Sequence, residues 1–325
     1  MKRSFFGILA LAAVGMGALV GCGDDSTGGG GTGATGAAGG AGGSGGAGGG
    51  TLTGQPIKIL NWNVHNFFDT VEDTTNTEND SQTQAAYNNK LDAVASVIGE
   101  IDPDIIVLQE VENEAVLADI DEALGSKYPE QDLIPGNDPR GVDIGALSKI
   151  SFTSVVSHLD ETFVVEGTVA PEFNFTRDLL EYHFKVGDQD VVLLGVHYKA
   201  KGPPDNPDKR LAEAQRTRAI ADELTAANPD LAVLVLGDYN DLPDSPPLDA
   251  ITGKAPDLYV DSASFAPEAD RWSFDYMGAH ELIDHQMANP KMAGRLDKSS
   301  IVIPHNTTVG TASDHSPVAA TYYLE

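Results

Sequence analysis

The sequence predicts a layered α/β protein with extensive β-sheet. Short apolar runs of strand length recur, and several are apolar on successive residues, which indicates strands covered on both faces. Segments with helical spacing of apolar residues lie between them, and this mixture favours layers over a helical bundle. Hydrophobic residues make up 41% of the chain, enough for a core. The predicted strands are Ile57–Leu60, Ile105–Leu108, Val191–Val196, Leu231–Leu236, Ile301–Ile303 and Val318–Tyr323.

Three helices are expected between these strands. Ala85–Ile101 and Asp208–Ala227 each carry apolar residues near helical spacing, and Asn113–Leu124 is the third candidate. The chain shows no internal repeat. Residues 55–325 are therefore expected to form one domain.

The first residues have the pattern of a secretory signal. Lys2 and Arg3 give a positive start, Phe5–Val20 form a short apolar run, and the chain's only cysteine, Cys22, follows. The tetrapeptide that ends at Cys22 resembles the signal of bacterial lipoproteins, in which that cysteine becomes lipid-modified. We expect a signal peptide over residues 1–21 and a lipid anchor at Cys22; an ordinary signal peptide with a coincidental cysteine is the alternative.

A flexible tether is expected to follow the anchor. Residues 22–54 are rich in Gly, Ala, Thr and Ser and hold 17 of the 35 glycines, so they cannot bury apolar surface. The chain has no uninterrupted apolar stretch of about 20 residues for a membrane span. The sequence thus predicts an exported lipoprotein of a bacterial cell envelope, anchored on the periplasmic or cell-surface side.

The composition excludes several kinds of site. A single cysteine excludes an intrachain disulfide framework, a cysteine-rich zinc module and an iron–sulfur site. The net charge of −29, from 20 Lys+Arg and 49 Asp+Glu, argues against a broad basic face for nucleic acid. Salt screens such repulsion over about 8 Å, so local contacts could still bind a phosphate.

Polar residues follow the apolar runs at the points where the predicted strands end. Such residues face a sheet edge where loops build sites, and a buried carboxylate there needs a partner, commonly a metal ion. Any one of them could equally cap a turn, so it is their joint occurrence that favours a site. The segments are Asn61-Trp62-Asn63, Gln109-Glu110, Val196-His197, Gly237-Asp238-Tyr239-Asn240, Ile283-Asp284-His285 and Ser313-Asp314-His315.

In this order, the segments resemble the endonuclease/exonuclease/phosphatase superfamily. Asn61–Asp69, Pro103–Glu112, Asp138–Asp143 and His197–Gly202 are most similar to its secreted bacterial nuclease-like branch. The resemblance covers nearly all of residues 56–323. It implies a four-layered α/β sandwich in which two central, mostly antiparallel sheets face each other and are flanked by helices.

The resemblance implies a divalent metal site. Glu110 and Asp314 match the carboxylates that hold the ion, and Asn63 matches a residue that supports the ion or a catalytic carboxylate. Hard oxygen ligands suit Mg²⁺, with Mn²⁺ or Ca²⁺ as alternatives.

Catalytic roles are also implied by the resemblance. Asp238 would orient or deprotonate the attacking water, and Asn240 would donate to the phosphoryl oxygens. His315 matches the catalytic histidine, with Asp284 fixing its tautomer and favouring its cationic form. His197 matches a second histidine near the scissile phosphate. Together with the metal, these groups would stabilise the charge that develops during displacement at phosphorus.

Several basic residues lie near the expected site. Lys201 and Arg140 are expected to contact substrate phosphate, although Arg140 could equally stabilise a turn. Lys199 and Lys201 alternate with His197 and could line the same side. Other residues are given no catalytic role: Arg210, Arg216 and Arg218, expected on a solvated helix face; His285, expected to point away from Asp284; and His65, His158, His183, His280 and His305.

These features predict a divalent-metal-dependent phosphoester hydrolase. A phosphodiesterase that acts on nucleic acid, as a monomer tethered to a membrane by its lipid anchor alone, is the first expectation. A lipid phosphodiesterase of the sphingomyelinase type or a phosphomonoesterase is the first alternative, and a catalytically silent binding module is the second. The full set of strand-end carboxylates and histidines favours an enzyme over a silent module.

Overall fold

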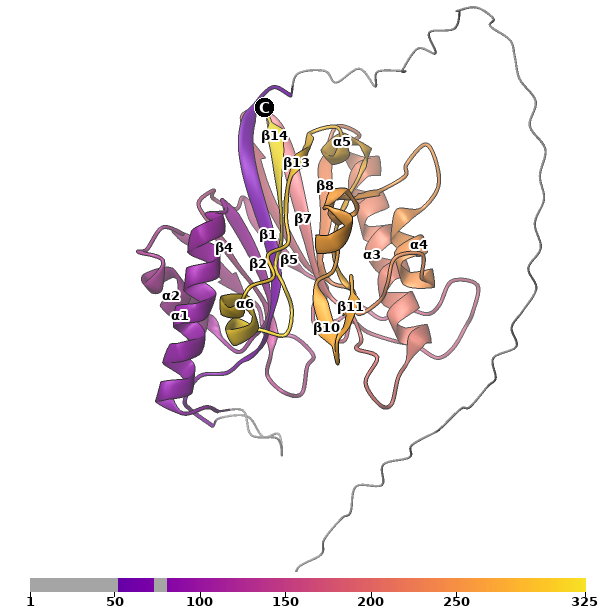
Figure 1. Ribbon diagram of the computed structural model, residues 1–325. Coiled ribbons are helices and arrows are strands. Elements are labelled where there is room, and N and C mark those ends of the chain that lie inside the picture. Colours follow the sequence, from indigo (N-terminus) through magenta and orange to yellow (C-terminus); the bar gives the residue numbers. More distant parts are fainter. Residues whose placement is uncertain (1–51, 73–80) are drawn as a thin grey trace, which may run out of the picture. The chain divides into compact units, whose positions relative to one another are not determined.

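Two six-stranded sheets face each other in the centre of the fold (Figure 1). The computed structural model describes residues 52–72 and 81–325. The predicted signal peptide, the lipid anchor at Cys22 and nearly all of the tether therefore lie outside the described residues. Within the described part, no helix is long and apolar enough to cross a membrane.

The first sheet has the strand order β13-β14-β1-β2-β4-β3, and the second has the order β5-β6-β7-β8-β12-β9. In each sheet one central pair is parallel, β1 with β2 and β7 with β8, and the other neighbouring pairs are antiparallel. The first sheet comprises β1 (Gln55–Phe67), β2 (Ile105–Val111), β3 (Glu130–Leu133), β4 (Asp143–Ser148), β13 (Leu296–Val302) and β14 (Val318–Leu324). The second comprises β5 (Ser154–Ser157), β6 (Leu180–Val186), β7 (Gln189–His197), β8 (Ala232–Asp238), β9 (Val260–Asp261) and β12 (Asp284–Ala288).

Helices cover the outer face of each sheet (Figure 1). The helices α1 (Gln84–Ile101), α2 (Glu114–Ala123) and α6 (Thr307–Ala312) pack on the first sheet. The second sheet is covered by α3 (Pro207–Ala227) and α4 (Pro246–Thr252), while the short helix α5 (Pro290–Ala293) lies near one end of β8. The order helix, sheet, sheet, helix confirms the four-layered sandwich with mostly antiparallel sheets.

The apolar runs of the strands are continuous because both faces of each sheet are buried. On β1, Ile57 and Ile59 pack into the core between the sheets, whereas Leu60 and Trp62 pack beneath α1. The predicted strand at Ile301–Ile303 overlaps only the end of the observed strand, since β13 begins at Leu296 and ends at Val302. Partly exposed residues dominate β13, so the hydrophobic signal marked only its end.

The predicted helices begin where side chains satisfy their first free N–H groups. Thr83 accepts from the backbone of Ala86 at α1, Asn113 accepts from Val116 at α2, and Asn206 accepts from Lys209 at α3. All three helices lie close to their expected positions. A small hairpin, β10 (Phe274–Tyr276) and β11 (Ala279–Glu281), projects from the second sheet's side of the fold (Figure 1).

Candidate active site

The strand-end residues gather because the two parallel pairs end at the same edge of the sandwich. Asn63 pairs with Gln109 across β1 and β2, and His197 pairs with Asp238 across β7 and β8. Asp284 begins the antiparallel β12 opposite Asp238. A cavity of about 190 Å³ opens there, lined by Asn63, His65, Asn66, Glu110, Arg140, His197, Ala200, Asp238, Asn240, Phe274, Asp314 and His315.

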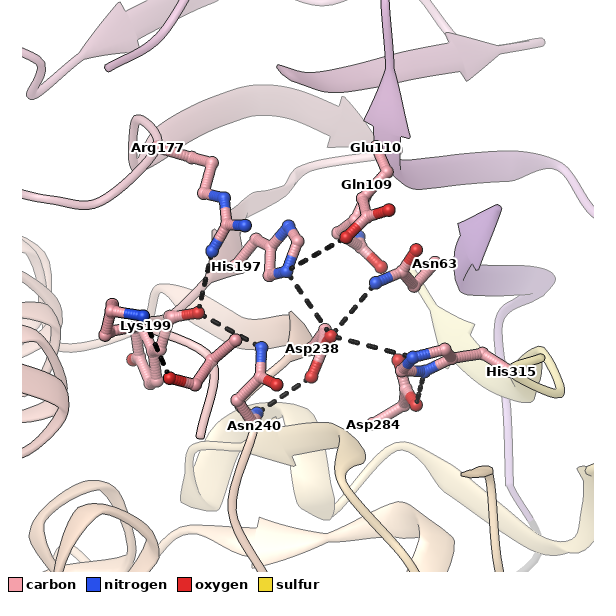
Figure 2. Close-up of polar contacts among 12 residues, drawn as sticks. Asn63, Gln109, Glu110, Arg177, His197, Lys199, Asp238, Asn240, Asp284 and His315 are labelled. Carbon is pink, nitrogen blue, oxygen red and sulfur yellow. Dashed lines mark hydrogen bonds and ion pairs between the residues drawn. The ribbon is translucent and has the colours of Figure 1, made fainter. Parts of the chain in front are cut away.

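His315 occupies one side of this cavity (Figure 2). Its Nδ1 lies 2.7 Å from Oδ2 of the fully buried Asp284, and its backbone carbonyl accepts from Nε1 of Trp62 at 2.8 Å. Burial alone would lower the pKa of His315, but the carboxylates of Asp284 and Asp238 outweigh it and raise the pKa to about 10. His315 is therefore held as an imidazolium with its Nε2 directed at Asp238, 4.0 Å away.

Asp238 lies at the centre of the site (Figure 2). Its Oδ2 accepts from Nδ2 of Asn63 at 3.0 Å, and its Oδ1 accepts from the backbone of Asn240 at 2.8 Å. Burial and the nearby carboxylate of Asp284 raise the pKa of Asp238 to about 7, against the opposing effect of His315. A carboxyl group that titrates near neutral pH is suited to accept a proton from water.

His197 faces Asp238 from the opposite side. Its Nε2 lies 3.4 Å from Oδ2 of Asp238 and 3.8 Å from Oε1 of Glu110. Its buried Nδ1 has no hydrogen-bond partner among the described residues. Burial, together with the charges of Arg177 and Arg140, holds the pKa of His197 well below its usual range, so this imidazole is neutral.

Glu110 closes the cavity at the end of β2. Its backbone has a φ of 64°, in the left-handed region, where the register of β2 with β4 also shifts. The Asn66 backbone donates to its Oε2 at 2.8 Å, and Arg140 Nη2 lies 3.6 Å from its Oε1. Burial raises the pKa of Glu110, but Arg140 and Arg177 outweigh it and hold the pKa below its usual range. Glu110 is thus a buried carboxylate that stays ionised.

Arg140 lines the cavity but is already engaged. It binds both oxygens of Asp138 through Nε and Nη2, at 3.1 and 2.9 Å, and donates to Oδ1 of Asn66 at 2.8 Å. Arg177 binds the same Asp138 from the buried side at 2.8 Å. This network fixes the Arg140 guanidinium at the cavity wall, with its side chain 27% exposed. Arg140 therefore stabilises the turn through Asp138 and is also accessible from the cavity, so the two expected roles do not exclude each other.

His65 lines the cavity although the sequence analysis gave it no role. Its Nδ1 lies 3.2 Å from Oδ1 of Asp314, whose side chain is 42% exposed. Both His65 and Asn66 have positive φ, and Lys90 donates to the carbonyl of His65 at 2.5 Å. Alternation along the strand did not indicate this position, because alternation holds for extended backbone and His65 has left-handed backbone.

Comparison with known proteins identifies the family to which the chain belongs. The model of the Endonuclease/Exonuclease/phosphatase family matches residues 58–309. The chain belongs to this family. No curated protein matches the chain. The family match stops before Asp314 and His315, so the inclusion of these two residues rests on the site geometry.

Solved structures share the family fold at low sequence identity. Truncated TDP2 from Caenorhabditis elegans has a TM-score of 0.59 at 19% identity, covering 84% of this chain and 100% of its own. A family protein from Bacteroides vulgatus has a TM-score of 0.57 at 16% identity, covering 83% and 100%. A mannosyl-6-phosphatase from Bacteroides thetaiotaomicron has a TM-score of 0.53 at 16% identity, covering 81% and 98%. At these identities the likeness extends to the fold alone.

Among residues 52–72 and 81–325, two groups of side chains could hold a cation. Asp238, Asp284 and His315 each place a ligand atom within 4.8 Å of the others. Their polar atoms are largely used in the hydrogen bonds given above, however, and His315 is protonated. Asn63, Glu110 and Asp314 also line the cavity and offer the hard oxygen donors that Mg²⁺, Mn²⁺ and Ca²⁺ prefer, so they fit such an ion.

The other basic residues lie differently from expectation. Lys201 does not line the cavity; its Nζ lies 2.9 Å from Asp241, and its contact with substrate stays a prediction. The expected solvated face of α3 was wrong for Arg210, which is 3% exposed and binds Asp241 and Asp205. Arg216 and Arg218 are also paired with carboxylates, of Glu161 and Asp222 respectively. Because acidic residues outnumber basic ones in this chain, these four basic side chains find carboxylate partners within the fold.

Proposed function

We propose that this protein is a divalent-metal-dependent phosphodiesterase that acts on nucleic acid. The observation that carries the proposal is the meeting of Glu110, Asp238 and His315 in one cavity, with an anionic carboxylate, a carboxyl group titrating near pH 7 and an imidazolium. Family membership supports a phosphoester hydrolase. The three charge states are those that water activation and stabilisation of a phosphoryl group require.

Glu110 and Asp314, supported by Asn63, would hold the divalent ion. When bound, a divalent ion neutralises phosphoryl charge and orients the ester. The ionised state of Glu110 keeps one ligand ready at neutral pH. All three residues line the cavity, and Mg²⁺ is the ion that this oxygen set fits best.

Asp238 would take the proton of the attacking water. The water oxygen bonds to phosphorus, one P–O ester bond breaks, the water's proton passes to Asp238, and the leaving oxygen takes up a proton from solvent. The His315 imidazolium and the amide of Asn240 would stabilise the phosphoryl oxygens. The side-chain nitrogen of Asn240 donates to the carbonyl of Tyr198 at 3.1 Å, which fixes the orientation of this amide.

Nucleic acid is favoured by the cations on the His197 side of the cavity. Lys199 lies two residues after His197. Burial lowers the pKa of Lys209, and the charges of Arg177 and Lys199 lower it further against the opposing carboxylate of Glu213, which indicates that these three cations lie near one another. Arg140 adds a cation in the cavity wall itself. On a protein of net charge −29, such a local group is the place where a polyanion can bind.

A substrate panel with and without EDTA tests this proposal. Linear DNA and RNA oligonucleotides, sphingomyelin and sugar phosphates are offered with Mg²⁺, and release of nucleotides, phosphocholine or inorganic phosphate is measured. We expect oligonucleotide cleavage that EDTA abolishes and added Mg²⁺ restores, and its loss in Glu110→Gln. Release of only phosphocholine or inorganic phosphate would replace the proposal by a lipid phosphodiesterase or a phosphomonoesterase.

We further propose that the protein is exported and anchored by lipid at Cys22. The support is the charged start, the short apolar run and the position of the chain's only cysteine. Fractionation of expressing cells tests it. Wild type should enter the membrane fraction, whereas Cys22→Ser should leave it; retention of the variant in the membrane would contradict a lipid anchor at this residue.

A further inference from the structure

A groove of about 580 Å³ adjoins the catalytic cavity. The two share Asp314 and His315, so the groove begins at the catalytic histidine. Asp275 and Met277 of the β10–β11 hairpin line the groove, as does Val309 of α6. Phe274, the first residue of the hairpin, lines the cavity instead. A substrate group attached to a phosphate in the cavity can therefore extend into this groove.

The wall of the groove is fixed by a stack of three rings. The ring of Trp272 lies 3.8 Å from that of His280 and 3.6 Å from that of His305, with interplanar angles of 11° and 8°. His305 is held in turn, its Nδ1 2.9 Å from Oγ of Ser316 and its Nε2 3.1 Å from the carbonyl of Asp270. The stack joins the hairpin to the segment before α6, so the groove is pre-formed, as small-molecule sites usually are.

The charge around the groove differs from that on the opposite side of the cavity. None of the described residues that line it is Lys or Arg, and two of them, Asp275 and Asp314, are acidic. Lys199 and Arg177 lie on the other side of Asp238 from His315 (Figure 2). Among the described residues that line the groove, only His315 is cationic, and a phosphate in the cavity would already engage it. A second phosphate, in the groove, would meet Asp275 with no Lys or Arg beside it, whereas an uncharged group would not be repelled.

We propose that the groove receives the terminal nucleoside of a nucleic-acid strand, an inference that rests on the proposed function. A terminal nucleoside carries no phosphate beyond the one that is cleaved, so it matches a groove that has no Lys or Arg to bind a second phosphate. The remaining phosphates run past Lys199 and Lys209 on the opposite side. Cleavage within a strand would place a phosphate on both sides of the cavity, one of them beside Asp275. The enzyme therefore removes units from strand ends.

Linear and circular single-stranded DNA of the same sequence distinguish the two modes. With Mg²⁺, we expect the linear strand to lose terminal units one after another, and the circular strand to be cleaved at least about tenfold more slowly, a difference of about 1.4 kcal/mol in the barrier. Labels at either end identify the first product. Equal rates on the two substrates, or first products from the middle of the linear strand, overturn the inference.

The variant Met277→Lys tests whether the groove causes the preference for linear over circular strands. Met277 is 90% exposed, so a lysine there adds a cation to the groove without disturbing the core. Because a phosphate could then be accommodated, the linear-to-circular rate ratio should fall about fivefold. Val169→Lys makes a charge change of the same kind at a 94% exposed position outside the groove and should leave the ratio unchanged. An unchanged ratio in Met277→Lys overturns the assignment of the terminal unit to this groove.

The failure of the proposed function gives a different result. If neither strand is cleaved while bis(p-nitrophenyl) phosphate is hydrolysed with Mg²⁺, the protein is a phosphodiesterase without action on nucleic acid, and the inference falls with that part of the proposed function. If both strands are cleaved equally, the proposed function stands and the inference alone falls.

Discussion

The cavity contains two buried histidines whose surroundings give them opposite charge states. Nδ1 of His315 has the carboxylate of Asp284 at 2.7 Å, and its pKa is raised to about 10. Nδ1 of His197 has no partner among the described residues, and the pKa of this ring is held well below its usual range. Both side chains are almost fully buried, so burial alone does not explain the difference.

The comparison shows that the partner of Nδ1 decides whether a buried histidine is charged, and with it the role that the ring can have. The carboxylate of Asp284 compensates for the burial of a cation on His315. On the other side, the cations Arg177 and Arg140 add to the cost of charging His197. One imidazole is thus suited to stabilise negative charge, and the other to offer or accept a single hydrogen bond.

Loss of the cationic ring has the largest expected effect. His315→Ala should lower kcat by about 10²–10⁴-fold, because it removes the imidazolium beside Asp238. Steady-state kinetics on an oligonucleotide measure it, with circular dichroism to verify folding. His183→Ala is a matched control, since His183 also pairs with a carboxylate, that of Glu181, but lies outside the cavity. A kcat for His315→Ala within a fewfold of wild type would show that the charge difference between His315 and His197 does not matter for catalysis.

Removing only the charge of Asp284, the partner of His315, should lower kcat less than the loss of His315 itself. Asp284→Asn keeps an oxygen that can accept from Nδ1 of His315 but loses the carboxylate charge, so the pKa of His315 should fall from about 10. We expect kcat to drop about 100-fold and the alkaline limb of the pH–rate profile to move to lower pH. An alkaline limb at the wild-type position would mean that another group titrates there.

The wild-type pH profile should be bell-shaped. Asp238 must be deprotonated to accept a proton, and its pKa is raised to about 7, so kcat should fall about tenfold per unit as the pH drops below that value. His315 must be protonated, so kcat should fall again as the pH rises through about 10. Rates measured from pH 5 to 11 at saturating Mg²⁺ check both limbs. A rate that is flat between pH 5 and 7 would exclude Asp238 as the base.

The smallest effect is expected for a change in the surroundings of the neutral imidazole, His197. Arg177→Gln removes one of the charges that, after burial, lower the pKa of His197, so this pKa should rise. Arg140 still binds Asp138 in this variant, which limits the damage to the network. Titration of the imidazole signals by NMR measures the shift, and the signal of His315 serves as the internal reference. An unchanged titration of His197 would show that the charge of Arg177 does not lower this pKa.

The strand-end pattern predicted much of the site because it follows from topology. Asn63 is the last residue of β1 before its register with β2 shifts, Glu110 is next to the end of β2, and His197 and Asp238 end β7 and β8. Parallel pairing brings these positions to one edge. The layers were predictable for a similar reason, since runs such as Val191–Val196 are apolar on both faces only when both faces are covered. These features depend on residues that are neighbours in sequence or in register.

Features that depend on distant partners were not predictable. Lys201 and Arg210 both bind Asp241, which lies 31 residues beyond Arg210, and no local pattern indicates this pairing. Phe274 lines the cavity, where its short strand forms a bridge with His315, a residue 41 positions further along the chain. His65 turns toward Asp314 through left-handed backbone, a conformation that its residue type does not announce.

The length of β1 separates the catalytic mouth from the beginning of the described chain. Gln55 pairs with Leu324 at one end of the strand, whereas Asn63, eight residues further along, lines the cavity about 26 Å away at a normal strand rise. The residues that precede Gln55 therefore join the domain at the end of β1 that is remote from the cavity, so an attachment made there leaves the cavity uncovered.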